Sequence, residues 1–136
     1  MAISTTQACF TCEAAKVWRV VTSLTEYAWR SDIKRIEVLE EGKKFAEYTQ
    51  NDFPTFFTIT AFEPLQRYEF DMENENMYGR WKGVFSYADG VTTITFTEDV
   101  HAKKFFMRPF VSSYLKKQQK LYMQDLQKAL AAPPQG

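Results

Sequence analysis

Two runs near the middle of the chain decide the fold: residues 67–73 read RYEFDME and residues 77–87 read MYGRWKGVFSY. In the first run, apolar residues alternate with charged ones, and a period of two is typical of a β-strand with one buried and one wet face. The second run keeps the period, with one register occupied by Met77, Gly79, Trp81, Gly83 and Phe85. An antiparallel sheet is therefore predicted at the centre of the chain.

The pattern extends in both directions along the sequence. Asp89-Gly90 is a strong hairpin signal, and residues 91–101 alternate again, with Ile94, Phe96 and Val100 on one side. Upstream, β-branched and aromatic residues with turn signals between them predict more strands at residues 3–10, 32–40, 45–50 and 53–62. The sheet is thus expected to have six or seven strands.

Helical periodicity occurs at both ends of this sheet. Thr11 is a candidate N-cap, and the spacing i, i+3, i+4, i+7 is followed by Ala14, Val17, Trp18, Val21 and Leu24. Residues 25–31 are expected to form a second short helix or a turn. After Pro109 a long helix is predicted, whose apolar face consists of Met107, Val111, Tyr114, Leu121, Tyr122, Leu126, Ala129 and Leu130. Gln119 is assigned to the opposite, polar face.

This order of elements predicts an α+β fold. Strand 1, two short helices, a meander of strands and one long helix follow one another without a linker or a repeat. The long helix is the element expected to cover the apolar face of the sheet. We expect one domain over residues 1–130 and a flexible tail over residues 131–136.

Composition excludes several classes of function. Seventeen basic residues balance seventeen acidic ones, and this balance disfavours a general nucleic-acid binder. No apolar run is long enough for a membrane span, and no signal peptide is recognisable, so a cytoplasmic protein with reduced cysteines is expected. Aromatic residues make up 16% of the chain, so aromatic rings should line the core. The oligomeric state stays open.

The chain resembles the START-like (SRPBCC) superfamily, which includes the polyketide cyclase/dehydrase and lipid-transport proteins. The resemblance rests on residues 11–18, TCEAAKVW, on Tyr27 and Trp29, and on residues 79–85 and 93–98 before a terminal helix. It implies a helix-grip fold, in which a curved antiparallel sheet wraps around the long C-terminal helix. It also implies a cavity for an apolar ligand between the sheet and that helix.

The candidate ligand-binding residues are aromatic side chains on inward registers, with a few polar ones between them. They are Trp29, Phe57, Phe70, Trp81, Phe85, Phe96, Glu98, Tyr114 and Gln118. Concave, mostly apolar sites with few polar groups are typical of ligand pockets. The alternative is a packed aromatic core with no pocket. Glu98 falls in register with inward residues, and it orients a ligand, pairs structurally with Arg80 or a tyrosine, or lies at the rim.

The remaining motifs favour structural interpretations. His101 is the only histidine, so we predict neither a metal site nor a cofactor. Cys9 and Cys12 form a C-x-x-C, with Cys12 expected in the first helical turn, but the βαβ context of a redox site is missing. Residues 103–120 are locally basic, which fits an anionic membrane surface, a nucleic acid, an acidic partner or a solvated helix face.

Three functions follow from these observations. The first is binding of a hydrophobic or lipid-like small molecule in an aromatic cavity, without a reaction. The second is a cyclase/aromatase-like enzyme in which Glu98 and tyrosines position and protonate a polyketide-like substrate. The third is a protein-interaction module with a filled core. The first is preferred, and no catalytic residue is assigned.

Overall fold

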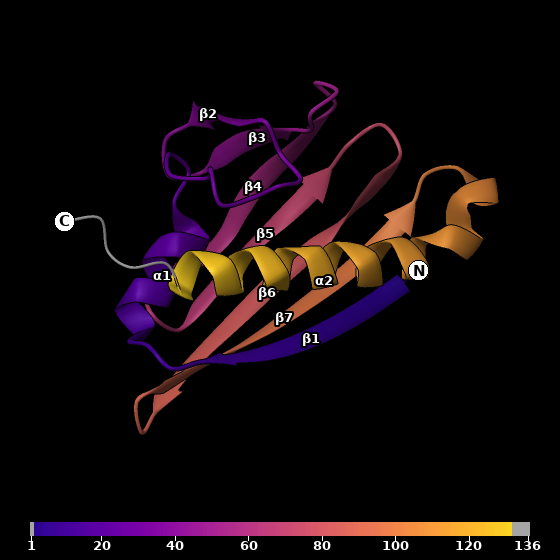
Figure 1. Ribbon diagram of the computed structural model, residues 1–136. Coiled ribbons are helices and arrows are strands. Elements are labelled where there is room, and N and C mark those ends of the chain that lie inside the picture. Colours follow the sequence, from indigo (N-terminus) through magenta and orange to yellow (C-terminus); the bar gives the residue numbers. More distant parts are fainter. Residues whose placement is uncertain (1, 132–136) are drawn as a thin grey trace.

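The computed structural model describes residues 2–131, which form one antiparallel sheet and two α-helices (Figure 1). The elements in chain order are β1 Ala2–Phe10, α1 Ala14–Thr22, β2 Arg35–Glu40, β3 Lys44–Tyr48, β4 Pro54–Glu63, β5 Arg67–Glu73, β6 Met77–Ala88, β7 Val91–Ala102, the 3₁₀ turn η1 Phe105–Met107, and α2 Arg108–Ala131. Helix α2 crosses one face of the sheet, and α1 lies at the end where α2 finishes (Figure 1). The predicted α+β helix-grip architecture is confirmed.

All neighbouring strands in the sheet are antiparallel. Their order is β1-β7-β6-β5-β4-β3-β2, so β2 to β7 form a meander and β1 adds to its far edge. Register shifts interrupt β2 between Val38 and Glu40 and β4 between Ile59 and Ala61. Such irregularities bend strands, and the sheet curls around α2 as a result.

The two central strands explain why one face of the sheet is buried. Along β6 and β7 every second side chain lies on the face of the sheet that the helices cover, and these positions carry Trp81, Phe85, Ile94, Phe96 and Val100. The hairpin between them turns at Asp89 and Gly90, whose φ angles are 53° and 78°. Aspartate and glycine tolerate positive φ, so this turn follows directly from the sequence.

The segment between β1 and β2 contains one short helix and not the two of the predicted fold. Helix α1 begins at Ala14, after Glu13, and no side chain caps it, so Thr11 is not its N-cap. Residues 25–31 adopt the turn alternative instead of a second short helix; the Arg30 N–H donates to the Tyr27 carbonyl at 2.9 Å. The segment is too short to nucleate a helix and has no apolar periodicity of its own. The turns place Trp29 and Arg30 over the sheet.

The buried face of α2 is rotated from the predicted one. It consists of Val111, Leu115, Gln119, Met123, Asp125, Leu126 and Leu130. Tyr114, which was predicted to be buried, is 46% exposed, and Gln119 is inside instead of on the polar face. The Lys16 ammonium of α1 donates to the Leu130 carbonyl at 3.0 Å, and this bond satisfies a free carbonyl in the last turn of α2.

Ala131 ends α2 and is therefore part of the helix, and not of the predicted tail. The rest of that prediction, residues 132–136, lies outside the described residues. Within residues 2–131, neither helix has the length and the apolar character needed to cross a membrane.

Candidate functional site

A cavity of about 190 Å³ lies between the concave face of the sheet and α2. For comparison, an apolar cavity of about 150 Å³ holds benzene, and drug-sized ligands occupy roughly 300–1,000 Å³. The cavity therefore has room for a small ligand with one or two rings. Eight of the nine predicted residues line it: Trp29, Phe57, Phe70, Trp81, Phe96, Glu98, Tyr114 and Gln118.

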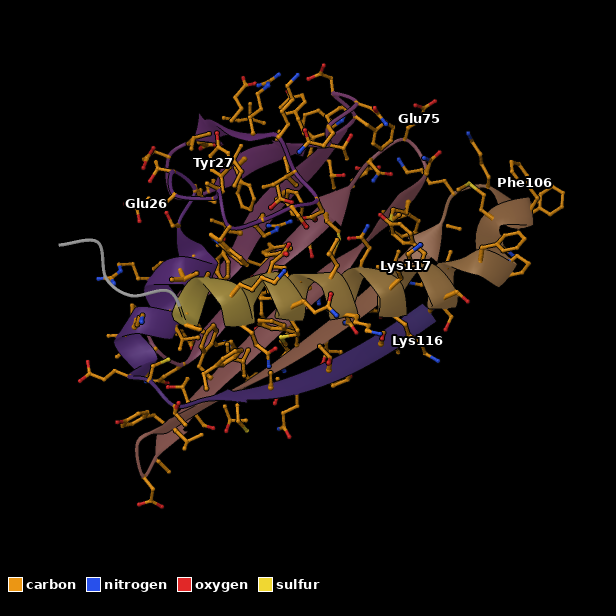
Figure 2. All side chains as sticks on the ribbon, in the orientation of Figure 1. Glu26, Tyr27, Glu75, Phe106, Lys116 and Lys117 are labelled. Atoms are coloured by element: carbon orange, nitrogen blue, oxygen red, sulfur yellow. The ribbon has the colours of Figure 1, made fainter. Side chains whose placement is uncertain are left out.

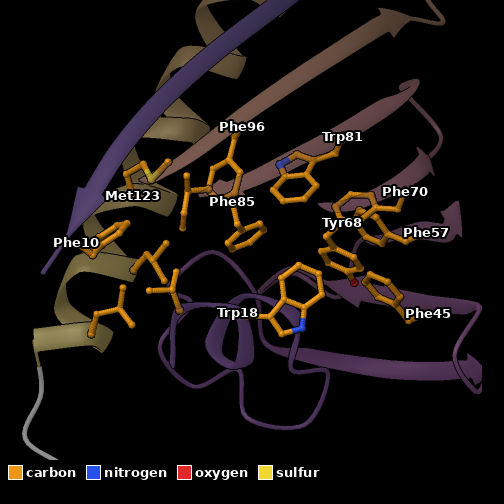
Figure 3. Packing of buried hydrophobic residues seen from close by; sticks show 14 residues of the cluster. Phe10, Trp18, Phe45, Phe57, Tyr68, Phe70, Trp81, Phe85, Phe96 and Met123 are labelled. Carbon is orange, nitrogen blue, oxygen red and sulfur yellow. The ribbon is translucent and has the colours of Figure 1, made fainter. Parts of the chain in front are cut away.

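The wall on the sheet side consists of rings in contact with one another (Figure 3). Phe45 stacks on Phe57 with a centroid distance of 4.8 Å. Phe70 stacks on Trp81 at 4.8 Å and 3°, and Trp81 meets Phe96 at 4.7 Å. Each ring is held by its neighbours, so the wall is a preformed apolar surface rather than a set of mobile side chains.

Phe85 is the predicted residue that the structure does not bring into the cavity. Its side chain is on the inward register of β6, but Trp18 of α1 covers it at 4.9 Å (Figure 3). A period of two predicts which face a residue takes, but not which part of that face α1 covers. Phe85 therefore belongs to the packed core beneath α1.

Three carboxyl groups line the cavity, and Glu98 is the one that forms no ion pair within residues 2–131. It lies on β7 opposite Trp81 of β6 and Ser4 of β1. Burial raises the pKa of Glu98 from its ordinary 4.5 to about 7, although a hydrogen bond with Gln119 and the charge of Arg30 act in the opposite direction. At neutral pH the group is thus divided between an acid that donates a hydrogen bond and a carboxylate that accepts one.

Of the partners suggested for Glu98 from the sequence, Arg80 is wrong. Arg80 is on the outer face of β6, where its Nε donates to Asp71 Oδ1 at 3.1 Å. Gln119, on α2, contacts Glu98 instead, and it is itself fixed by Ser4 of β1. Ser4 Oγ donates to Gln119 Oε1 at 2.8 Å, and Gln119 Nε2 donates to the Ser4 carbonyl at 3.0 Å. This clamp sets the position of α2 over the edge of the sheet beside Glu98.

A second polar group, absent from the sequence prediction, also lines the cavity: Arg30 with Asp32 and Glu47. Arg30 Nη2 lies 2.9 Å from Asp32 Oδ2 and 3.1 Å from Glu47 Oε1. Its guanidinium also lies over the Tyr122 ring at 5.2 Å. Burial lowers the pKa of Arg30, but the carboxylates of Glu47 and Asp32 outweigh it and raise the pKa well above its ordinary value. Arg30 is therefore a permanent cation that ties three elements together.

Three of the tyrosines that line the cavity have a raised pKa and stay neutral. Burial is the main cause for Tyr68 and Tyr122, and partial burial together with the charge of Glu98 acts in the same direction on half-exposed Tyr114. Trp29 also lines the cavity, and its Nε1 is buried and has no hydrogen-bond partner within residues 2–131.

Sequence comparison assigns the chain to a family. The profile described as "Polyketide cyclase / dehydrase and lipid transport" matches residues 1–131. The chain belongs to the polyketide cyclase/dehydrase and lipid-transport family. No curated protein sequence matches it.

Solved structures support the same fold for this family member. A START superfamily protein from Mycobacterium smegmatis is similar with a TM-score of 0.84 and 11% identity, over 94% of this chain and 96% of that one. The di-domain ARO/CYC BexL from the BE-7585A biosynthetic pathway gives 0.78 at 9% identity, over 94% of this chain and 46% of that one. The Aha1 dimer from Colwellia psychrerythraea gives 0.74 at 14% identity, over 96% of both chains. At these identities the likeness concerns the fold alone.

Within this family fold, the remaining sequence motifs lie away from the cavity. Cys9 points outward from β1, where its Sγ lies 3.4 Å from Thr93 Oγ1, and Cys12 precedes α1 rather than lying in its first turn. His101 stacks on Tyr78 at 5.0 Å on the outer face. Across residues 2–131, no cluster of three or more His, Cys, Asp or Glu side chains is arranged to hold a metal ion.

Proposed function

We propose that this family member binds a small, flat, apolar molecule that carries a hydrogen-bonding oxygen. The observation that carries the proposal is a cavity of about 190 Å³ whose aromatic wall contains a carboxyl group with a pKa of about 7. A core that served only packing would gain nothing from burying Glu98, because an unpaired carboxylate costs free energy in an apolar surrounding. The cavity itself argues against an interaction module with a filled core.

The rings and the polar groups have different tasks in this proposal. Phe70, Trp81 and Phe96 supply area for stacking with a ring. Glu98, when protonated, donates to a carbonyl oxygen, and the Trp29 ring adds apolar area to the wall. Arg30 is already paired with two carboxylates, so it positions the wall rather than binding the ligand.

Two probes of nearly equal size test the proposal: acetylnaphthalene and ethylnaphthalene. Both should raise the melting temperature, because a ligand that binds only the folded state stabilises it. The carbonyl of the first probe should give about tenfold tighter binding below pH 7, since one hydrogen bond to a buried donor contributes about 1.5 kcal/mol. Above pH 7 the ionised Glu98 cannot donate a hydrogen bond, so the difference in affinity between the two probes should shrink.

Matched variants separate the contributions. Glu98→Gln keeps an N–H donor, so the carbonyl preference should remain and lose its dependence on pH. Phe70→Leu, in the cavity wall, should weaken both probes, whereas Phe85→Leu, which removes a ring outside the cavity, should lower stability and leave binding unchanged. If neither probe shifts the melting temperature of the wild-type protein, the proposal is wrong.

An enzyme is the second candidate, favoured by the same carboxyl group. A pKa near neutrality suits a general acid or base, and three neutral cavity tyrosines could hold a phenolic or enolic substrate. A cyclase-like reaction on a polyketide-like substrate would then need the proton of Glu98. In that case Glu98→Gln should abolish turnover while keeping substrate affinity; unchanged turnover would exclude this role.

We also propose that the protein acts in the cytoplasm. Cys9 and Cys12 are both free thiols in the structure, and free thiols persist where the compartment is reducing.

A further inference from the structure

The N-terminal end of α2 and the turn before it form an exposed aromatic tip. Phe105, Phe106 and Phe110 are 76%, 61% and 69% exposed. Together with Lys103, Lys104 and Arg108 they define what we call the Phe tip. It projects beyond the end of the sheet (Figure 1), and the Phe106 ring lies at its outermost point, directed away from the body of the molecule (Figure 2). Three rings left in water within six residues have no structural purpose in the described chain.

The charges of the sequence segment that contains the tip have one sign. Between Asp99 and Asp125 the sequence contains no acidic residue, but it contains the cations Lys103, Lys104, Arg108, Lys116, Lys117 and Lys120. The chain as a whole has a net charge of zero, so this segment is strongly polarised relative to the rest. The positive charge is therefore concentrated in this segment and does not come from an excess of basic residues in the whole chain.

Most of this positive charge is not neutralised by neighbouring elements. Lys103 pairs with Glu73 of β5 at 2.7 Å, and Glu75 lies in the adjacent turn. Within residues 2–131, Lys104 and Arg108 form no ion pair. The same is true of the lysines on the exposed side of α2, of which Lys116 and Lys117 are seen in Figure 2.

We propose that the Phe tip inserts into the headgroup region of an anionic phospholipid membrane. Exposed phenylalanines next to lysine and arginine match such an interface, where rings enter the acyl boundary and cations contact the headgroups. The long stems of Lys104 and Arg108 can lie along the apolar region while their charges reach phosphate. The tip is convex, so it offers no groove for a peptide, and two copies of it would repel each other through their like charges.

The position of the tip relative to the cavity gives this contact a direction. Tyr114 follows Phe110 by one helical turn on the same side of α2. Of the described residues that line the cavity, Tyr114 is the exposed one. Met77 and Asn74 line the same end, and the Lys103 N–H donates to the Asn76 carbonyl there at 2.8 Å. A membrane at the tip therefore faces the Tyr114 end of the cavity. The membrane contact itself stands without the ligand proposal.

Vesicle flotation tests the inference. Wild-type protein is mixed with phosphatidylcholine vesicles, or with vesicles that also contain phosphatidylglycerol, at low and at high NaCl. We expect at least tenfold more protein to float with the anionic vesicles, and we expect salt to reduce the bound fraction because it screens exposed charges. Equal flotation with both lipids, or none with either, would overturn the proposal.

Paired variants keep the test specific. Phe105→Ser/Phe106→Ser should reduce binding about tenfold or more, whereas Phe56→Ser/Tyr87→Ser removes two half-exposed rings elsewhere and should not reduce it. Lys104→Gln/Arg108→Gln should remove most of the anionic preference, and Lys44→Gln/Lys82→Gln should retain it. All of these side chains are exposed, so circular dichroism should show unchanged folding. Equal binding of a tip variant and its control would also overturn the proposal.

Discussion

Asp125 of α2 holds Ser31 through a single carboxylate oxygen. Its Oδ2 accepts hydrogen bonds from the backbone N–H and from the hydroxyl of Ser31, both at 2.8 Å. Asp125 is buried, and Ser31 ends the turn segment that carries Trp29 and Arg30. One helix residue thus fixes the loop that forms a wall of the cavity, although the two residues are 94 positions apart in the chain.

Replacing Asp125 should release this loop. Asp125→Ala loses two charge-assisted hydrogen bonds but also removes a buried carboxylate, so we expect a net loss of about 1–3 kcal/mol in the free energy of unfolding. Ser31→Ala keeps the backbone bond and should cost about 1 kcal/mol or less. Urea unfolding measures both. Equal losses in the two variants would show that the backbone bond contributes nothing.

Arg30 should be the most costly charge to remove. Arg30→Met leaves the carboxylates of Asp32 and Glu47 close together without a cation, which we expect to cost about 3–5 kcal/mol at neutral pH. Arg35→Met is the matched control. The Arg35–Glu37 pair is close to half-exposed, so its loss should cost less than about 1 kcal/mol. Similar losses in urea unfolding would contradict the structural role given to Arg30.

The inward position of Glu98 was predictable because a strand has a fixed period of two. Once Ile94 and Phe96 are placed on the buried face of β7, Glu98 must follow them. The same argument places Phe57, Phe70 and Trp81 correctly. The argument fails for Phe85, because the strand pattern does not tell which part of the buried face α1 covers.

The positions of Gln119 and Arg30 in the site could not be predicted from the sequence, for two different physical reasons. A helix advances by about 100° per residue, so an error of one position in its rotation exchanges Gln119 with its exposed neighbours. Arg30 finds Glu47 on another element, 17 residues away, and no local periodicity connects a turn to the face of a strand. Its sequence signal is only a charged residue between Trp29 and Asp32.

Stability should depend on pH through Glu98. Its pKa is higher in the folded protein, about 7, than in the unfolded chain, near 4.5, so the folded state binds the proton more tightly. The contribution of Glu98 to stability is therefore full below pH 4.5 and is lost as the pH rises through 7. The loss amounts to about 3 kcal/mol, and Glu98→Gln escapes it because its side chain stays neutral.

The measurement compares Glu98→Gln with wild type by urea unfolding from pH 4.5 to pH 8. The stability of the variant relative to wild type should grow over this range and level off above pH 7. At the acidic end both side chains are neutral, so that point is the internal control. A difference that stays constant across the range would contradict a buried, protonated Glu98.

Gly79 and Gly83 should respond differently to a methyl group, because different atoms fill the space above them. A Cβ on Gly79 would meet the Asp99 carbonyl oxygen and Val100 Cα, which are backbone atoms and cannot move away without shifting β7. At Gly83 it would meet the Trp81 ring at 2.6 Å, and a side chain can yield. We expect Gly79→Ala to cost about 3 kcal/mol and Gly83→Ala about 1 kcal/mol in urea unfolding. Because Trp81 lines the cavity, Gly83→Ala should also weaken binding of acetylnaphthalene; unchanged binding and equal costs would show that Gly83 does not set the position of that ring.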